Sequence, residues 1–338
     1  MARLAEWLLN ALPGGYGRRL SREQRIYAEA TQVHDLPPIF HYWSHNYVRP
    51  MLLELGADNP DVFFARHLRE SAQRTGSKRA RLLSIGAGNC DTEVRIAQEF
   101  VRSGWREFEI ECLELNPKML ARGRGMALAH GLDDHLVFQQ GDFNHWRSKR
   151  QYDGVMANQS LHHVTRLEHL FDQVRDALAE GAWFLTSDMI GRNGHQRWPE
   201  ALTELNGFWR ELPESHHYNH LLRRAEPDYV NHDCSSEGFE GIRAQDVLPQ
   251  LLERFSFPAF AAFGNVIDVF VDRCFGPNFS LDAESDRAFV DRVHARDEEL
   301  LRCGTITPTH MFAVMSREAE PVRVHSRGLS PQRCVRRV

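Results

Sequence analysis

The stretch LLSIGAGNCD at residues 82–91 decides the fold. Its first four residues are apolar or small, as expected of a short buried strand, and Gly86, Ala87 and Gly88 follow directly. Glycines at the end of such a strand let the main chain turn tightly and let a ligand approach the backbone. Enzymes of several classes use this device, so the loop indicates a ligand-binding turn without selecting one ligand.

Strand and helix patterns alternate on either side of this stretch. Amphipathic helices are expected after residue 91 and over residues 120–130 and 167–178, and a later helix over 246–255. Strands separated by helices predict an α/β fold with a parallel sheet and right-handed crossovers. The expected strands cover residues 82–85, 108–113, 136–138, 153–157, 182–187, 258–263 and 311–315.

Three regions differ in character along the chain. Residues 1–79 are expected to form a helical N-terminal extension or lid, and residues 80–316 the α/β domain. Two long insertions, at about 190–241 and 266–308, are expected to form a helical cap. Residues 317–338 contain many arginines and few apolar residues, which predicts a disordered basic tail.

Composition excludes several classes of function. The chain has 338 residues and a net charge of −5, which argues against a nucleic-acid partner. Stable membrane insertion is not expected, and the apolar run Trp7–Leu9 is too short for the core of a signal peptide. The six cysteines include no C-x-x-C pair, which is typical of a cytoplasmic protein with reduced thiols. Nothing in the sequence predicts the oligomeric state.

Asp91 follows the glycine loop where a dinucleotide site needs a small residue. A carboxylate there would repel a pyrophosphate bound at the helix N-terminus. S-adenosylmethionine has no phosphate but carries a sulfonium and an amino group, which suit a carboxylate. Asp91 can also simply cap the following helix, and the two roles are compatible.

Two further carboxylates end the next strands. Glu114 ends the second strand, where an acidic residue can accept hydrogen bonds from both hydroxyls of a ribose. Gly141, Asp142 and Phe143 end the third strand, where a carboxylate can accept from an adenine amino group while an aromatic ring packs on the base. Alone, Glu114 could be a surface residue and the Gly-Asp pair a turn.

The ordered set LLSIGAGNCD, Glu114, Gly141–Phe143 and YDGVMANQSLHH (residues 152–163) resembles the class I S-adenosylmethionine-dependent methyltransferases over about residues 80–188. The resemblance implies a Rossmann-like, doubly wound sheet of seven strands with the last strand antiparallel. The family usually has an acidic residue where Ser84 stands and often a glycine where Cys90 stands; Asp91 can substitute for the acidic group. The implied cofactor-binding residues are Gly86, Ala87, Gly88, Asp91, Glu114, Leu115, Asn116, Gly141, Asp142, Phe143, Asn158 and Gln159.

Candidate catalytic residues follow the fourth strand. His162 and His163 lie at the carboxyl edge, where ligands bind, and a hydroxyl acceptor needs a base to remove its proton. One histidine of the pair is expected to pack and the other to face the acceptor. Related methyltransferases carry a similar Leu-His-His segment beside the cofactor.

Two other groups are candidates for substrate contact. Tyr42 and Trp43 belong to an aromatic cluster that either packs in the core or walls the pocket. His216 and His220 are four residues apart, so on a helix they would share a face. No further ligands complete a metal site around this pair, and we expect no metal.

The sequence therefore predicts an S-adenosylmethionine-dependent methyltransferase of a small molecule. A hydroxyl or carboxyl oxygen of a metabolite, lipid or sugar derivative is the expected acceptor, because insertions at the carboxyl edge suit an enclosed site. N- or C-methylation of a small molecule is the alternative. A nicotinamide-dependent oxidoreductase and a non-catalytic cofactor-binding module are further alternatives, disfavoured by Asp91 and by the polar residues of the pocket.

Overall fold

One sheet of eight strands forms the centre of the computed structural model, which describes residues 15–28, 35–236 and 238–336. The apolar run Trp7–Leu9 lies outside the described residues. The strand order is β10-β8-β9-β5-β4-β1-β2-β3. The strands are β1 (Ala80–Ile85), β2 (Phe108–Glu114), β3 (Leu136–Gln140), β4 (Gly154–Asn158), β5 (Trp183–Met189), β8 (Ser256–Phe263), β9 (His310–Ser316) and β10 (Val324–His325).

The predicted strand directions are confirmed. β1 pairs in parallel with β2 and β4, and β9 runs antiparallel between β5 and β8. The sheet thus contains the expected seven strands with an antiparallel last one. It also contains β10, a two-residue strand that pairs in parallel with β8 and that the sequence did not predict.

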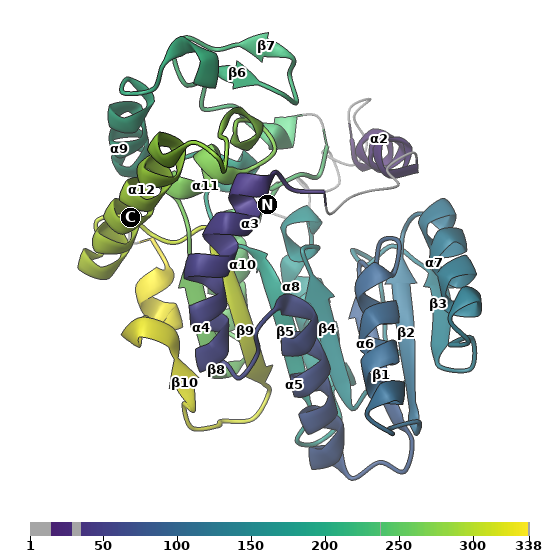
Figure 1. Ribbon diagram of the computed structural model, residues 1–338. Coiled ribbons are helices and arrows are strands. Elements are labelled where there is room, and N and C mark those ends of the chain that lie inside the picture. Colours follow the sequence, from purple (N-terminus) through teal and green to yellow (C-terminus); the bar gives the residue numbers. More distant parts are fainter. Residues whose placement is uncertain (1–14, 29–34, 237, 337–338) are drawn as a thin grey trace, which may run out of the picture.

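Helices cover both faces of the sheet (Figure 1). The helices α5 (Pro60–Thr75), α6 (Asp91–Arg102) and α7 (Pro117–Ala129) lie on one face, and α8 (Leu167–Ala177) and α10 (Ala244–Leu252) on the other. Because side chains alternate along a strand, Leu82 packs in the core under the first group while Leu83 and Ile85 pack under the second. The central strands are therefore buried on both faces, which explains their continuous apolar runs.

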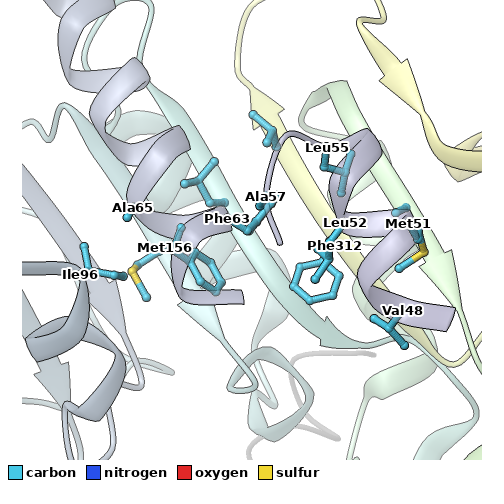
Figure 2. Packing of buried hydrophobic residues seen from close by; sticks show 14 of the residues in the cluster. Val48, Met51, Leu52, Leu55, Ala57, Phe63, Ala65, Ile96, Met156 and Phe312 are labelled. Atoms are coloured by element: carbon cyan, nitrogen blue, oxygen red, sulfur yellow. The ribbon is translucent and has the colours of Figure 1, made fainter. Parts of the chain in front are cut away.

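The last helix of the N-terminal region, α5, belongs to the layer that covers the sheet. Helix α5 packs directly on β4 and β5, so the expected boundary at residue 79 separates this helix from the sheet that it covers. Phe63 of α5 and Leu52 of α4 (Arg49–Glu54) meet Phe312 of β9 in the same core (Figure 2). Before them lie α2 (Tyr16–Ala28) and α3 (Pro38–Trp43).

The two insertions form the cap beyond the carboxyl ends of the parallel strands (Figure 1). The first leaves from β5 and contains α9 (Pro199–Trp209) and a small hairpin of β6 (Tyr218–Asn219) and β7 (Arg224–Ala225). The second leaves from β8 and contains α11 (Val266–Val271) and α12 (Glu284–Cys303). Within the described ranges, no helix has the length and apolar character needed to cross a bilayer.

The C-terminal segment differs from the expected disordered tail over the part that the structure describes. Leu329 and Cys334 are buried against the sheet. Two of its arginines stack on tryptophans: Arg323 lies 4.6 Å from the ring centre of Trp183, and Arg336 lies 4.2 Å from that of Trp198. The arginines of the tail also pair with Glu70, Glu298 and Glu200. The prediction was wrong because it counted charge without the acidic and aromatic partners that the folded chain supplies.

Candidate active site

The turns after β1 and β4 meet at the carboxyl edge of the sheet. Gly86 has a φ of 70°, and a Cβ there would lie 2.5 Å from the Cβ of Ser160. The Ser160 hydroxyl donates to the carbonyl oxygen of Ile85 at 2.7 Å, which fixes the two turns together. Only glycine allows this approach, so Gly86 is explained by packing between the turns as well as by the need for a bare backbone.

Glu114 joins the glycine turn to the end of β2. Its carboxylate accepts hydrogen bonds from the backbone N–H of Gly88 at 2.9 Å and of Asn116 at 2.8 Å. Burial raises the pKa of Glu114, and these backbone N–H groups oppose the rise. A carboxylate has about four acceptor positions, and the backbone N–H groups of Gly88, Leu115 and Asn116 use three of them, so one remains for a ribose hydroxyl. Its place and remaining capacity fit a ribose.

Asp142 is contacted by a residue that the sequence did not single out. Its carboxylate accepts from the hydroxyl of Tyr16 at 2.6 Å, from Nδ1 of His145 at 2.9 Å and from the backbone N–H of Asn144 at 2.9 Å. Burial raises the pKa of Asp142, but the hydrogen bonds from Tyr16 and His145 outweigh it and the pKa falls. Tyr16 lies on α2, so the N-terminal extension reaches the expected adenine end of the site, beside the buried Phe143.

Glu93 is a second site residue that sequence reasoning missed. It lies in the first turn of α6, is 2% exposed, and accepts a hydrogen bond from the hydroxyl of Ser84 at 2.6 Å. Its other carboxylate oxygen is buried without a hydrogen-bond partner. Burial raises the pKa of Glu93 to about 7. A carboxyl group thus lies beside Ser84, where the family pattern has an acidic residue, but it comes from the helix rather than from the strand.

Asp188 organises the turn that carries the histidine pair. This residue of β5 is fully buried and accepts from the backbone N–H groups of Ser160 and Leu161 at 2.9 and 2.7 Å. It also pairs with Nδ1 of His162 at 2.7 Å. The Nε2 atom of His162 is thereby directed away from the sheet. Burial alone would lower the pKa of His162, but Asp188 and Glu240 outweigh it and raise the pKa to about 10.

Glu240 brings three histidines together from distant parts of the chain. Its carboxylate lies 3.4 Å from Nε2 of His162, 3.5 Å from Nε2 of His163 and 2.7 Å from Nε2 of His195. Burial would raise the pKa of Glu240, yet the histidines hold it well below the usual range. The sequence predicted the first two histidines, but Glu240 and His195 belong to an insertion without a recognisable motif.

The remaining predicted cofactor residues lie at the same edge. Asp91 begins α6 after Cys90, which adopts a left-handed conformation. Asn116 caps α7 by accepting from the backbone N–H of Lys118 at 3.0 Å. Ala87 lies in the glycine turn, Leu115 and Gly141 follow β2 and β3, and Asn158 and Gln159 end β4.

The predicted substrate residues contact the second insertion and not the histidine cluster. The hydroxyl of Tyr42 donates to Asp291 of α12 at 3.0 Å, and Trp43 is 2% exposed in the core. These contacts support the alternative that both side chains pack α3 against the cap. His216 and His220 lie in a 3₁₀ turn and in the β6–β7 hairpin, so the premise of a shared helix face was wrong. His216 faces Asp286, and His220 pairs with Asn278.

A hollow of about 180 Å³ lies at the opposite edge, where β5 and β8 begin. His67, Trp183 and Arg323 are among the residues that line it. Because the chemically active groups gather at the carboxyl edge, this hollow is not part of the candidate site.

Comparison with known proteins agrees with the geometry. The family model described as a methyltransferase domain matches residues 57–229, which is more than half of the chain. The chain belongs to this methyltransferase family. The match begins just before α5, in agreement with the packing of that helix on the sheet, and the predictions of the family and of its cofactor S-adenosylmethionine are confirmed.

Named relatives share part of the methyltransferase chain. A trans-aconitate 2-methyltransferase of Mycobacterium tuberculosis (strain ATCC 25177 / H37Ra) is 30% identical over 132 residues, which cover 37% of this chain and 46% of that protein. The corresponding protein of Mycobacterium marinum is 29% identical over 132 residues, covering 37% and 45%. The match thus spans about half the length of these relatives. The solved geranyl diphosphate C-methyltransferase of Streptomyces coelicolor A3(2) is 13% identical, covers 91% of this chain and all of that one, and has a TM-score of 0.45.

Proposed function

We propose that this methyltransferase transfers the methyl group of S-adenosylmethionine to an oxygen atom of a small molecule. The observation that carries the proposal is the arrangement at the carboxyl edge. Acidic side chains lie beside the glycine turn after β1, and a histidine cluster follows β4 and β5 at the same edge. The first group suits a cofactor with a ribose and two cationic groups, and the second suits an oxygen acceptor.

The chain's own residues divide the binding of the cofactor among them. Glu114 would accept a hydrogen bond from a ribose hydroxyl. Asp142 would accept a hydrogen bond from the adenine amino group in addition to the one from the hydroxyl of Tyr16. Glu93 would face the cationic end, because its buried carboxylate oxygen without a partner would be stabilised by a nearby positive charge. Asp91, at the start of the same helix, would add a second negative charge there. The bound cofactor supplies an activated methyl group, so these residues contribute mainly by positioning.

The histidine cluster distinguishes two kinds of oxygen acceptor. A hydroxyl must lose its proton, and His163 is the better candidate base, because Asp188 and Glu240 keep His162 protonated at neutral pH. A carboxylate needs no base, and it would instead be attracted by the positive charge of His162. Either acceptor, a hydroxyl or a carboxylate, would place an oxygen atom next to His162 and His163.

Two further observations support a small acceptor. Both insertions lie beyond the carboxyl ends of β5 and β8 (Figure 1), an arrangement that suits an enclosed site for a small acceptor. The partial relatives are named for trans-aconitate, a small carboxylic acid. Methylation of a carboxyl oxygen is therefore the first acceptor class to examine, and amines and carbon nucleophiles are the alternatives.

The test combines cofactor binding with product detection. Calorimetry should show micromolar binding of S-adenosylmethionine and S-adenosylhomocysteine, roughly −8 kcal/mol. Incubation with isotope-labelled cofactor and separate panels of carboxylic acids, alcohols, phenols and amines, followed by mass spectrometry, identifies the acceptor atom. Label in amines alone would overturn the assignment of an oxygen acceptor. Binding of a nicotinamide dinucleotide in place of both S-adenosyl ligands would overturn the methyltransferase proposal itself.

A further inference from the structure

The cluster around Glu240 has the composition and spacing of a metal site. Its imidazole and carboxylate atoms come from the turn after β4 and from the first insertion. One ligand atom each from His162, His163 and Glu240 lies within 4.8 Å of the others. We propose that His162, His163 and Glu240 form a binding site for one divalent transition-metal ion, with zinc as the best match, and that His195 positions the carboxylate of Glu240.

The distances agree with tetrahedral coordination. Zinc bonds to imidazole nitrogen and carboxylate oxygen at about 2.0–2.2 Å, so two ligand atoms on one tetrahedral ion lie roughly 3.4 Å apart. Oε1 of Glu240 lies 3.4 Å from Nε2 of His162, and its Oε2 lies 3.5 Å from Nε2 of His163. One ligand atom of each of the three residues lies within 4.8 Å of the others, so a small shift would bring all three onto one ion. Nε2 of His195 lies 2.7 Å from Oε1 of Glu240, and this hydrogen bond would orient the carboxylate. Imidazole-rich sites with one carboxylate favour zinc over magnesium or calcium.

Asp188 gives His162 the support that is typical of a metal ligand. A ligand histidine almost always donates its second ring N–H to a carboxylate or a carbonyl, which fixes the ring and the tautomer. Nδ1 of His162 lies 2.7 Å from the fully buried Asp188, so its Nε2 faces the cluster. Asp188 is itself held by backbone N–H groups at Leu161 and Met189, which makes the pair rigid.

The loops that bring His195 and Glu240 together are locally specialised. His195 adopts a φ of 57°, an uncommon conformation for a residue with a side chain, and follows Gly194 with a φ of 64°. Gly194 donates its backbone N–H to the carbonyl oxygen of Gly241 at 2.9 Å. A Cβ at Gly241 would lie 3.0 Å from Cε1 of His195. This close backbone contact therefore holds the side chains of His195 and Glu240 next to each other.

The cluster around Glu240 differs from the pair His216 and His220, for which the sequence predicted no metal. His216 and His220 face two different partners, Asp286 and Asn278, whereas the two proposed imidazole ligands lie 3.4 and 3.5 Å from one carboxylate. Glu240 is the most exposed of the three proposed ligands, at 37%, so the site opens on that side. An ion there would present positive charge to an oxygen acceptor in place of a protonated His162, and His163 would act as a base only in the metal-free protein. This purpose rests on the proposed function, but the binding of the ion does not.

The test uses the full chain with Co²⁺ and Zn²⁺ as probes. After treatment with a chelator and dialysis, Co²⁺ should bind at one equivalent and produce the intense visible bands of tetrahedral coordination, and Zn²⁺ should abolish them. Glu240→Gln and His163→Ala should each weaken binding at least about 10-fold, and Asp188→Asn, which removes the charge that orients His162, about 10- to 100-fold. His130→Ala is the matched control, because His130 is exposed at the end of α7.

A second measurement does not depend on folded variants. In the unaltered protein, bound Co²⁺ should shift the proton resonances of ligand imidazoles far outside the usual range. Absence of both the visible bands and the shifted resonances would overturn the proposal. So would full affinity in Glu240→Gln and His163→Ala variants whose circular dichroism matches the parent. Methyl transfer by metal-free protein would leave the proposed function standing without the ion, and metal binding without methyl transfer would do the reverse.

Discussion

The cofactor half and the acceptor half of the site are built in different ways. In the cofactor half, Gly86, Glu114 and Asp142 each follow successive strands, so their order along the chain is their order along the sheet edge. In the acceptor half, Glu240 and His162 meet although they lie 78 positions apart in the sequence, and Glu240 comes from an insertion with no regular pattern. Sheet topology alone places the first group, whereas the second depends on tertiary contacts.

This difference implies that the halves can be separated by mutation. Residues at the strand ends should govern cofactor affinity, and residues of the histidine cluster should govern turnover. The four predictions below test that separation, beginning with the largest expected effect.

The largest effect is expected in the acceptor half. In metal-free protein, His163→Ala should lower turnover about 10²- to 10⁴-fold if the acceptor is a hydroxyl, because a positioned base contributes that much. The affinity for S-adenosylhomocysteine, measured by calorimetry, should stay within about twofold. The exposed His130→Ala serves as the control. A large loss of cofactor affinity in the His163 variant would show that the two halves are not separate.

A strong effect on stability is expected beneath the glycine turn. The raised pKa of Glu93 means that its buried carboxyl group binds a proton more tightly in the folded state than in the unfolded one. Below about pH 4.5, Glu93 is protonated in both the folded and the unfolded state, so its burial as a charge costs no stability. As the pH rises to about 7 the burial costs increasing stability, and above pH 7 the full cost of roughly 3 kcal/mol applies.

Glu93→Gln should therefore stabilise the cofactor-free protein at pH 8 and have little effect at pH 4.5. Urea unfolding at the two pH values measures the difference. The same variant should bind S-adenosylmethionine more weakly, since it lacks the negative charge assigned to the cationic end of the cofactor. Equal stability changes at both pH values would contradict the raised pKa, and unchanged binding would remove Glu93 from the site.

Glu114→Ala should weaken cofactor binding about 10- to 100-fold, because each hydrogen bond to a charged group contributes about 1.5–3 kcal/mol. Turnover at saturating cofactor should change little. Glu107→Ala, at an exposed position before the same strand, is the matched control. If both variants bind as tightly as the parent, Glu114 does not hold the ribose.

The smallest effect is expected at the tail. Arg336→Ala removes an ion pair with Glu200 and a stacking contact with Trp198, each contributing about 0.5–1 kcal/mol at an exposed site. Chemical unfolding should show a loss of roughly 1 kcal/mol relative to the parent, whereas Arg302→Ala, whose side chain is exposed, should unfold like the parent. An equal loss in both would indicate a general charge effect.

The sequence was sufficient for the sheet and for most of the cofactor half. Short continuous apolar runs between helical patterns located the seven main strands, because central strands are buried on both faces and their covering helices bury one apolar face. The prediction of a disordered tail was wrong, because the arginines of the tail find their partners only after folding. Strand β10 was missed, because a strand of two residues has no periodicity.

In the acceptor half, too, the sequence predicted only the residues that lie next to a recognisable element. His162 and His163 could be predicted because they directly follow a predicted strand. Glu93 was overlooked because a carboxylate in the first turn of a helix usually stabilises the helix dipole from the surface, and here it turns inward toward Ser84. Tyr16, His195 and Glu240 reach the site over long sequence separations, which no local pattern encodes.

The tail also makes the cap sensitive to ionic strength. Its arginines connect the two insertions, through Glu200 on α9 and Glu298 on α12, to the body of the protein at Glu70. Added salt screens such partly exposed ion pairs over about 8–10 Å, while buried contacts are affected much less. Salt would therefore loosen the cap from the outside, without any ion entering the active site. An inhibition by salt that disappears when the tail arginines are replaced would have this origin.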